Sequence, residues 1–427
     1  QDVQGESFDY PEVFFEEKVH EIRRVHPDPS QINQAVEKIK NSKQPIIISG
    51  GGVLYSEAEQ ELSKFAKKHN IPVTSTVMGI GCMTKDDPYY ISAVGALGEG
   101  SSNSLSKDTD LALAIGTKLA DFTTGSWANF ENPNFKLVSV NTARYDTTKH
   151  LATPVISDAK VGLQKISEAL GDWKAPDDWY KRAIKEKNEW DAYVEKQSGP
   201  TNQEEPSYAH AVGAVYRNSD PSDIVVTAAG GLVGEVVQVW KPKQLNTFET
   251  EWGFSCMGYE ISGALGIKMA KPDQDVVVFV GDGSYLLNNT DIYSSVIYDQ
   301  KLIIIVCDNG GHMVINRLQL AKGGKEYICN LRAARATNLK FVDFENHAKS
   351  MGANAETVSS TSELEAAYKR AKDSDKTYVI TIKTHGYEWL EGTAFWESPT
   401  LQDPITDNNK SALEDFESGK SKQRKGV

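Results

Sequence analysis

Two short apolar segments, each followed at once by a polar, glycine-rich loop, constrain the fold of this chain most strongly. Val, Ile and other apolar side chains dominate residues 275–280 and 302–307, a pattern typical of strands buried on both faces of a parallel sheet. The loops that follow, residues 281–284 and 308–311, therefore leave the carboxyl edge of that sheet. Open α/β folds bind their ligands at this edge, so the sequence predicts an α/β fold with a ligand site there.

Length and composition limit the class of protein. A chain of 427 residues, 39% hydrophobic and 25% charged, is too long for one ordinary core and predicts a globular protein of two or three domains. Its formal charge of -13, with scattered Lys and Arg, argues against nucleic acid and membrane as partners. The basic residues 420–425 are interpreted as a solvated terminus.

The cellular compartment is predicted from the absence of membrane-spanning, signal-peptide and disulfide patterns in the sequence. No apolar run approaches the roughly 20 residues of a membrane span, and no signal-peptide pattern opens the chain. The four cysteines have neither zinc spacing nor a disulfide framework. We expect a cytoplasmic protein.

The first half of the chain reads as a doubly wound α/β domain. Residues 1–30 are a polar arm, and residues 31–171 form the domain itself. We expect strands at residues 45–49, 71–76, 110–116 and 136–141. We expect helices at residues 56–69, with Ser56 as N-cap, and 160–170.

The second half also alternates predicted strands and helices, although its sequence does not repeat that of the first half. Residues 172–206 are expected to be a helical linker and residues 207–397 a second doubly wound domain. Residues 398–427 are polar and are expected to be a poorly ordered tail. In the second domain we expect helices at residues 208–217, 257–269 and 362–372, with strands at 223–227 and 376–383 beside the two opening segments.

The paired loops offer hard oxygen ligands. Asp282 and Asn309, 27 residues apart, supply a carboxylate and an amide, and Gly311 supplies a backbone carbonyl. Mg²⁺ wants about six oxygens, so such a site expects a ligand that brings phosphate oxygens. Gly283 allows close approach, and the amides of Ser284 and Tyr285 can donate to phosphate. A Gly-Asp-Gly tripeptide alone is more often a tight turn, but the second, Asn-bearing loop favours the metal site.

In these motifs the chain resembles the thiamine-diphosphate enzymes, whose signature is Gly-Asp-Gly, a spacer of this size and a closing Asn-Asn. Asp308 replaces the first Asn here, and only the second is a metal ligand in the family. The resemblance implies thiamine diphosphate and Mg²⁺ as cofactors, with Mg²⁺ held by Asp282, Asn309 and the Gly311 carbonyl. It also implies that the diphosphate is contacted by Gly230, Gly231 and Ser284.

Residues 252–259 resemble the family's pyrimidine-binding turn, which places Ser255 and Met257 at the cofactor. Met257 falls where these enzymes carry a bulky apolar side chain that wedges the cofactor into a bent shape. The alternative is that Met257 only fills a core gap.

The first domain resembles the central domain of the acetolactate-synthase branch. Its likeness is carried by residues 45–52, 71–76 and 114–118. Glycines 50 to 52 follow a strand, but Val53 and Leu54 break the spacing of a nicotinamide fingerprint. We therefore interpret this domain as structural rather than as a dinucleotide site.

Within the superfamily, nearly the whole chain resembles the trihydroxycyclohexane-dione hydrolases, ring-opening enzymes of inositol breakdown. The motifs that carry this likeness are residues 9–12, 121–127, 253–260, 281–285, 291–295 and 314–319. The resemblance implies hydrolytic cleavage of a ring carbon-carbon bond in a small cyclic dione, giving 5-deoxy-glucuronate. The alternatives are a carboligase of the acetolactate-synthase kind and a non-catalytic scaffold. His312 can either face substrate or serve the loop backbone.

The family also takes a glutamate from an N-terminal pyrimidine domain to activate the cofactor, and we expect that domain to be absent before Gln1. Glu249, Glu251 and Glu260 lie near the cofactor motifs, but the family pattern gives none of them this role, and surface or helix roles are expected. No catalytic residue is therefore predicted in this chain, which alone should be inactive. Because family active sites form between subunits, we expect a homodimer or homotetramer.

Overall fold

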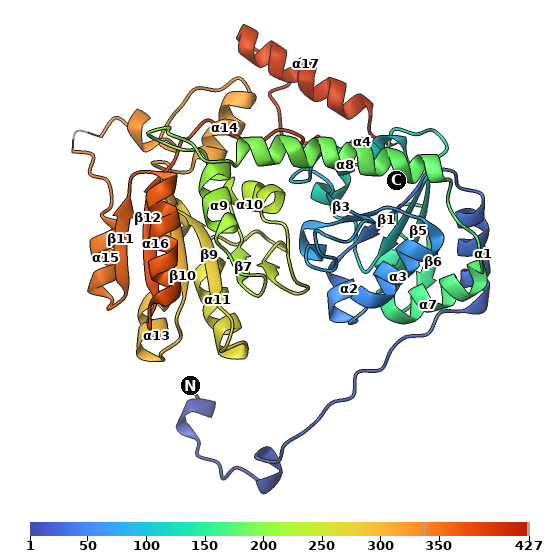
Figure 1. The fold of residues 1–427 in the computed structure, drawn as a ribbon, viewed down its shortest axis with the longest axis horizontal. Coiled ribbons are helices and arrows are strands. Elements are labelled where there is room, and N and C mark those ends of the chain that lie inside the picture. Colours follow the sequence, from blue (N-terminus) through green and yellow to red (C-terminus); the bar gives the residue numbers. More distant parts are fainter. Residues whose placement is uncertain (337, 425–427) are drawn as a thin grey trace.

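The two halves of the chain form two α/β units that lie side by side (Figure 1). The computed structural model describes residues 1–336 and 338–424. Each unit contains a six-stranded sheet in which every pair of neighbouring strands is parallel. The predicted fold class, two doubly wound parallel sheets, is therefore confirmed.

The first sheet has the order β3-β2-β1-β4-β5-β6, so the direction of winding reverses between β1 and β4. Ile47 packs into one apolar cluster, and Ile46 and Ile48 pack into another on the opposite face. This double burial explains why β1 is a continuous apolar run. The strands are Pro45–Ser49 (β1), Val73–Ser75 (β2), Tyr90–Ala93 (β3), Leu111–Ile115 (β4), Lys136–Asn141 (β5) and Thr153–Ile156 (β6).

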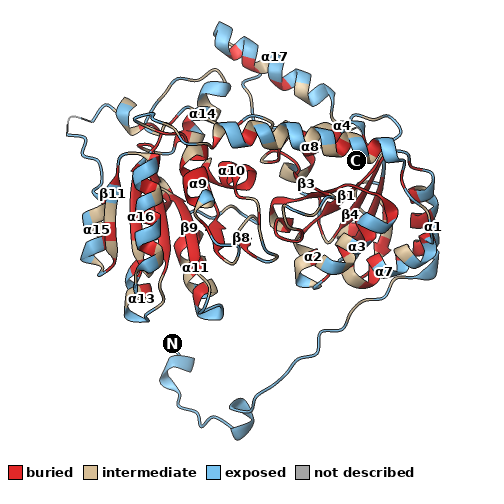
Figure 2. Ribbon diagram, viewed as in Figure 1, coloured by how far each residue is buried: buried red, intermediate tan, exposed pale blue. Residues whose placement is uncertain are grey.

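Helices cover both faces of this sheet, and their outer sides are exposed while the strands are buried (Figure 2). Their bounds are Pro29–Lys40 (α1), Gly51–Tyr55 (α2), Glu59–His69 (α3), Gly100–Asp108 (α4), Asp121–Thr124 (α5), Arg144–Thr148 (α6) and Ala159–Leu170 (α7). The 21-residue helix α8, Asp177–Gln197, then crosses from the first unit to the second (Figure 1). It contacts α4 and β3 on one side and α9 and α10 on the other.

The second sheet has the order β11-β12-β10-β9-β7-β8 and reverses between β7 and β9. Val277 and Phe279 face one apolar cluster, while Val278 and Val280 face the cluster on the other side. The strands are Ile224–Thr227 (β7), Phe248–Thr250 (β8), Val276–Gly281 (β9), Ile303–Asp308 (β10), Asn354–Val358 (β11) and Tyr378–Lys383 (β12). The helices are Tyr208–Arg217 (α9), Leu232–Val239 (α10), Tyr259–Ala270 (α11), Asp282–Leu287 (α12), Asp291–Ile297 (α13), Met313–Ala321 (α14), Phe344–Ser350 (α15), Thr361–Asp373 (α16) and Asp407–Ser421 (α17).

Two expectations about local structure were wrong. Ser56 does not begin a helix but ends α2, since its amide bonds back to Gly52, and α3 starts only at Glu59. The tail is not without structure, because α17 forms within it and buries Phe416 near Phe395. The sequence also gave no signal for the edge strands β3, β6, β8 and β11, which are short and carry polar residues.

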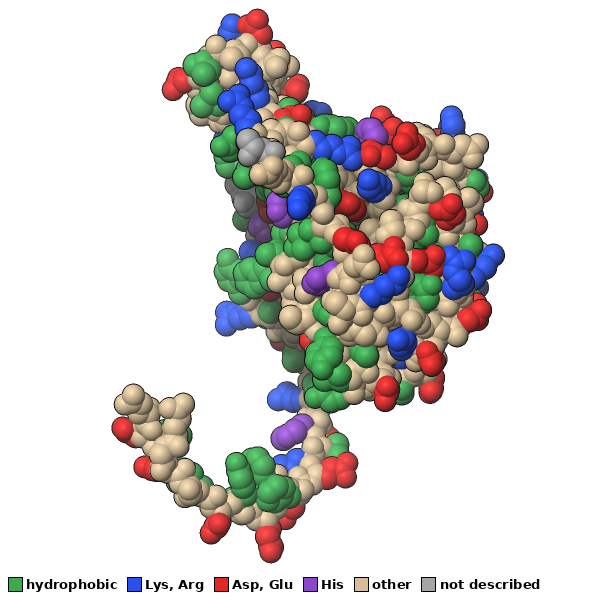
Figure 3. All heavy atoms as spheres, turned by 90° about the vertical axis from the view of Figure 1, so that its left-hand side faces the viewer, with side chains coloured by type: hydrophobic (Ala, Val, Ile, Leu, Met, Phe, Trp, Pro, Cys, Tyr) green, Lys and Arg blue, Asp and Glu red, His purple; other side chains and the backbone are tan. Residues whose placement is uncertain are grey.

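The arm before α1 projects from the first unit and carries exposed aromatic side chains, a cluster visible at the base of Figure 3. Tyr10, Phe14 and Phe15 pack against one another there while remaining largely exposed. Among the described residues, no helix combines the length and the apolar character that crossing a membrane requires.

Candidate cofactor and metal site

The reversal of winding between β7 and β9 opens a crevice at the carboxyl edge of the second sheet. Residues 229–232 after β7, 281–284 after β9 and 311–315 after β10 line one cavity of about 560 Å³. The structure therefore brings the loops singled out by sequence to a single cavity, at the edge where they were expected.

Two of the three predicted metal ligands, Asp282 and Gly311, line this cavity, whereas Asn309 does not line it and contacts the lining residue Tyr208. Asp282 is buried, and its Oδ2 accepts the amide of Gly311 at 2.7 Å. Asn309 is buried as well, and its Nδ2 donates to the hydroxyl of Tyr208 at 2.6 Å. The Asn309 Oδ1 atom has no hydrogen-bond partner among the described residues. A buried amide oxygen without a partner is the kind of group that a cation satisfies.

The two neighbouring carboxyl groups of Asp282 and Asp308 also favour a cation at this site. Burial, together with the neighbouring Asp308 carboxylate, raises the pKa of the Asp282 carboxyl to about 7. The described residues contain no cluster of three or more His, Cys, Asp or Glu suited to a metal. A hard cation here would therefore need oxygens from a ligand such as a diphosphate.

Tyr208, at the start of α9, has no counterpart in the sequence prediction. It is buried at the edge of the cavity, and burial raises the pKa of its hydroxyl well above the ordinary value, with Asp282 adding to the rise. Sequence gives no signal for this role, since Tyr208 lies 74 residues before Asp282 on another element.

Glycines shape the backbone around the crevice. Gly230 has a φ of +80°, and a Cβ there would point into open space. At Gly231 a Cβ would lie 2.1 Å from the Trp389 ring, and at Gly311, with φ of +140°, it would lie 2.4 Å from the Cys329 carbonyl oxygen. Larger side chains at 231 or 311 would therefore collide with fixed neighbours.

Of the residues predicted to contact phosphate after β9, the structure leaves the backbone amides available rather than the side chains. Gly283 and Ser284 line the cavity, but the Ser284 hydroxyl donates to both Glu260 oxygens at 2.8 Å, so its amide is the group available to a phosphate. Tyr285 does not line the cavity. Its ring lies in the core and its hydroxyl bonds to His347 Nδ1 at 2.9 Å. Only the backbone amide of Tyr285 keeps the predicted role.

The turn before α11 faces the cavity with Ser255 and Met257. Ser255 has a φ of +54°, and its hydroxyl donates to the carbonyl of Ala228 at 3.3 Å, which joins this turn to the loop after β7. The Glu251 carboxylate accepts the amides of Phe254 and Cys256 and closes the turn. Met257 is 37% exposed, so it is not core filler.

Of the two roles expected for Glu260, surface or helix, the structure shows the helix position and excludes the surface one. Although it lies in the first turn of α11, it is 1% exposed. It accepts hydrogen bonds from the amides of Ala229 at 3.3 Å and Gly258 at 2.9 Å, in addition to the Ser284 hydroxyl. Burial raises the pKa of its carboxyl. One carboxylate thus joins the loop after β7, the turn before α11 and the start of α12.

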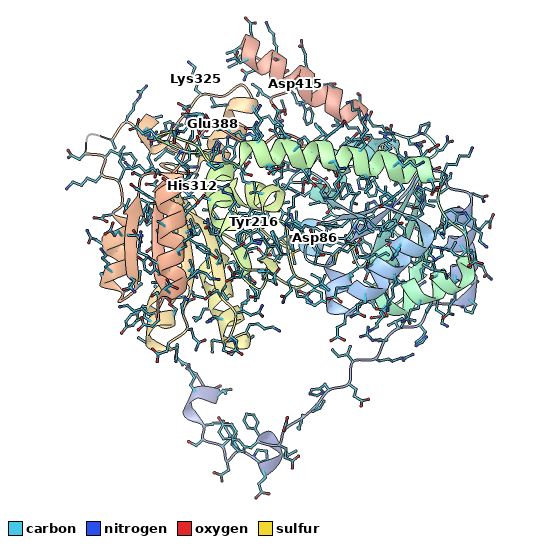
Figure 4. The ribbon with its side chains drawn as sticks, viewed as in Figure 1. Asp86, Tyr216, His312, Lys325, Glu388 and Asp415 are labelled. Carbon is cyan, nitrogen blue, oxygen red and sulfur yellow. The ribbon has the colours of Figure 1, made fainter. Side chains whose placement is uncertain are left out.

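His312 lies at the carboxyl edge of the second sheet, near the top of the view in Figure 4. Its amide donates to the Cys329 carbonyl at 2.8 Å, which is the expected backbone role. Its ring also lines the cavity and lies over Gly283, where a Cβ would come within 2.6 Å of it. Both readings of His312 are therefore compatible with the structure.

The opposite wall of the cavity comes from other parts of the chain. Ala96, Leu97 and Phe122 belong to the first unit, and the segment after β12 contributes Thr393, Ala394, Trp396 and Ser398. The cavity therefore lies where the two units meet.

Comparison with known proteins defines the class. The thiamine pyrophosphate enzyme central domain matches residues 32–166, and the thiamine pyrophosphate enzyme C-terminal TPP binding domain matches residues 228–382. The chain belongs to the thiamine pyrophosphate enzymes, so the predicted family is confirmed.

Several similar curated proteins carry the name 3D-(3,5/4)-trihydroxycyclohexane-1,2-dione hydrolase. The protein of that name from Geobacillus thermodenitrificans is 34% identical, with 92% of this chain and 67% of the relative covered. The one from Clostridium tetani is 35% identical with the same coverage. The one from Lacticaseibacillus casei is 32% identical, with 98% of this chain and 69% of the relative covered. The predicted likeness to these hydrolases is confirmed.

Proposed function

We propose that this chain acts in the thiamine-diphosphate- and Mg²⁺-dependent ring opening of 3D-(3,5/4)-trihydroxycyclohexane-1,2-dione to 5-deoxy-glucuronate, in myo-inositol catabolism. Relatives at 32% to 35% identity carry the name of that hydrolase. The observation that carries the proposal is the pair of buried oxygen groups, the Asp282 carboxyl with its raised pKa and the unpartnered Asn309 Oδ1.

Each part of the cofactor has residues that fit it. Asp282, Asn309 and the Gly311 carbonyl would hold Mg²⁺. The diphosphate would lie against Gly230, Gly231 and the amides of Gly283 and Ser284, which all line the cavity, with the amide of Tyr285 next along the chain. When bound, thiamine diphosphate supplies the carbon centre that takes up charge as a carbon-carbon bond breaks.

The side chains of this chain then fix the geometry. Tyr208 holds the Asn309 amide so that its oxygen faces the metal position. Ser255 and Met257 support the ring end of the cofactor, because both line the cavity on the turn before α11. Glu260 keeps the three surrounding segments in register.

We further propose a homodimer or homotetramer. Large apolar side chains are exposed on α11, α12 and α13, of which α11 and α13 pack against each other, and exposed apolar surface marks interfaces. They are Met269, Leu286, Leu287, Tyr293 and Ile297. The acid that activates the cofactor is assigned to a domain beyond these residues, since Glu251 and Glu260 are already engaged by backbone amides.

Calorimetry tests the cofactor site. Titration of the chain with thiamine diphosphate should show binding that requires Mg²⁺ and is lost in Asp282→Ala. Binding without Mg²⁺, or equal binding by the variant, would contradict the assignment.

Activity assays test the reaction. A protein that includes the pyrimidine domain should open the dione and should not turn over pyruvate alone, whereas a carboligase would consume pyruvate. The 427-residue chain alone should bind the cofactor without ring opening, and measurable turnover by it would refute that expectation.

A further inference from the structure

Three aromatic side chains from three distant segments meet at the junction of the two units. Phe122 lies on α5, Trp252 follows β8 and Trp396 lies in the segment after β12. The ring centroids of Phe122 and Trp252 are 5.6 Å apart, and those of Phe122 and Trp396 are 5.0 Å apart. All three line the cavity that holds the candidate cofactor site, and all are only partly buried. We call these three residues the aromatic corner.

Phe122 is held in place by its surroundings. Its carbonyl accepts the amide of Ala96 at 2.7 Å. A Cβ at Gly95 would lie 2.1 Å from the same oxygen, so the close contact requires glycine. These contacts fix the backbone at Phe122, and its ring packs against the rings of Trp252 and Trp396.

Trp396 is fixed from both sides by the first unit. The Ala394 amide donates to the Gly95 carbonyl at 3.1 Å, and the Glu397 amide donates to the Ser126 hydroxyl at 2.8 Å. Ser126 and Phe122 belong to the motif at residues 121–127, which the cofactor chemistry leaves without a role. That motif supplies one ring of the corner and anchors another.

The charges around the cavity define what the corner can accept. Two cations, Arg317 and Lys322, line the cavity. The Arg317 guanidinium lies over the Trp389 ring at 5.1 Å, and Lys322 Nζ donates to the Thr400 hydroxyl at 2.9 Å. The contacts of both cations are therefore with residues outside the corner. Aromatic faces carry partial negative charge, so they attract C–H groups and disfavour a carboxylate.

We propose that the aromatic corner is the substrate subsite, which stacks the ring of a neutral, polyhydroxylated cyclohexane and disfavours small 2-oxo acids. This inference rests on the proposed function and specifies how the site selects its substrate. The flat faces of a six-membered ring bear C–H groups that pack on aromatic rings, while its hydroxyls point outward to polar groups and water.

Steady-state kinetics test the corner in a protein that includes the pyrimidine domain, with thiamine diphosphate and Mg²⁺ saturating. Trp396→Leu and Phe122→Leu should each raise KM for the dione about tenfold with kcat changed much less, since an aromatic contact of this kind gives about that factor. Trp396→Phe should recover most of the affinity. The matched control is Trp127→Phe in the same motif, because Trp127 packs on Phe130 and His150 outside the cavity. Unchanged KM in both leucine variants would overturn the proposal.

A binding assay separates this proposal from the proposed reaction. With cofactor and Mg²⁺ bound, calorimetric titration with unreactive myo-inositol should show saturable binding to the wild-type protein, about tenfold weaker in Trp396→Leu, while pyruvate should show none. If the cofactor binds but the dione is not turned over, the proposed reaction fails, and this titration still tests whether the aromatic corner binds the polyol. Binding of pyruvate but not of the polyol would refute the inference.

Discussion

Tyr208→Phe is the substitution that tests most directly how the metal site is built. It removes one hydroxyl from a buried position and leaves the ring in place. The hydroxyl is the only hydrogen-bond partner of the Asn309 side chain among the described residues. Without it, the amide is free to turn its nitrogen toward the Asp282 carboxylate, which would remove the oxygen from the metal position.

The expected size of the effect follows from burial. Asn309 is 3% exposed, so a lost partner leaves a buried amide unsatisfied, at a cost of about 1–3 kcal/mol in folding free energy. Loss of a group that orients a metal ligand typically weakens metal affinity about 10- to 100-fold. In binding free energy this is about 1.4–2.8 kcal/mol.

Calorimetric titration of Mg²⁺ at saturating thiamine diphosphate measures the affinity, and chemical denaturation measures stability. The matched control is Tyr368→Phe, which removes another buried hydroxyl in the same unit, bonded to Asp223 Oδ2 at 2.7 Å. The control should lose similar stability with unchanged Mg²⁺ affinity. Equal Mg²⁺ affinity in Tyr208→Phe and wild type would refute the orienting role of Tyr208.

Three further outcomes are expected. Asp282→Asn should lower the affinity for Mg²⁺ at least 100-fold, because it removes the carboxylate charge of the metal site. Calorimetry measures this affinity, and a smaller loss would argue against direct ligation. Glu260→Ala should lower the affinity for thiamine diphosphate about tenfold or more, because the loop after β7, the turn before α11 and the start of α12 lose their shared hydrogen-bond acceptor. Glu260→Gln should lose less affinity because its amide oxygen still accepts hydrogen bonds. Equal losses of affinity in the two variants would contradict the role of Glu260 in joining these segments. Burial raises the pKa of Glu235 from 4.5 to about 7, so the folded state keeps a proton that the unfolded state releases, and stability should fall as pH rises between these values. Denaturation across that window should show the fall, by up to about 3 kcal/mol, and Glu235→Gln should reduce it; an unchanged pH slope in the variant would be the contrary result.

The parts of the fold and site that could be predicted share one property: their signal is local. Strands β9 and β10 are continuous apolar runs because both faces are buried, so their ends, and the loops carrying Asp282 and Asn309, could be located from sequence. Helix α9 was predicted with its observed bounds, and its N-cap Ser207 forms a capping box with His210.

The parts that could not be predicted depend on which segments meet in space. Tyr208, Glu260 and Trp396 are important because they contact residues at least 24 positions away along the chain. Nothing in their local pattern distinguishes them from core or surface residues. Glu260 shows this most clearly, because a glutamate in the first turn of a helix is normally a surface residue, and here the surrounding loops bury it.

The two sheets have the same kind of topology, but the glycine-rich loops at the two reversals of winding pack differently. Between β1 and β4, the amide of Gly52 donates to the Gly116 carbonyl at 2.9 Å, and a Cβ at Gly50 would lie 2.5 Å from that oxygen. The glycines after β1 therefore let backbone pack on backbone and fill the position where a nucleotide would enter. Between β7 and β9, by contrast, Gly230 faces open space. A glycine-rich loop after a parallel strand thus indicates close approach, but whether the approaching group is a ligand or the protein itself depends on the opposing strand.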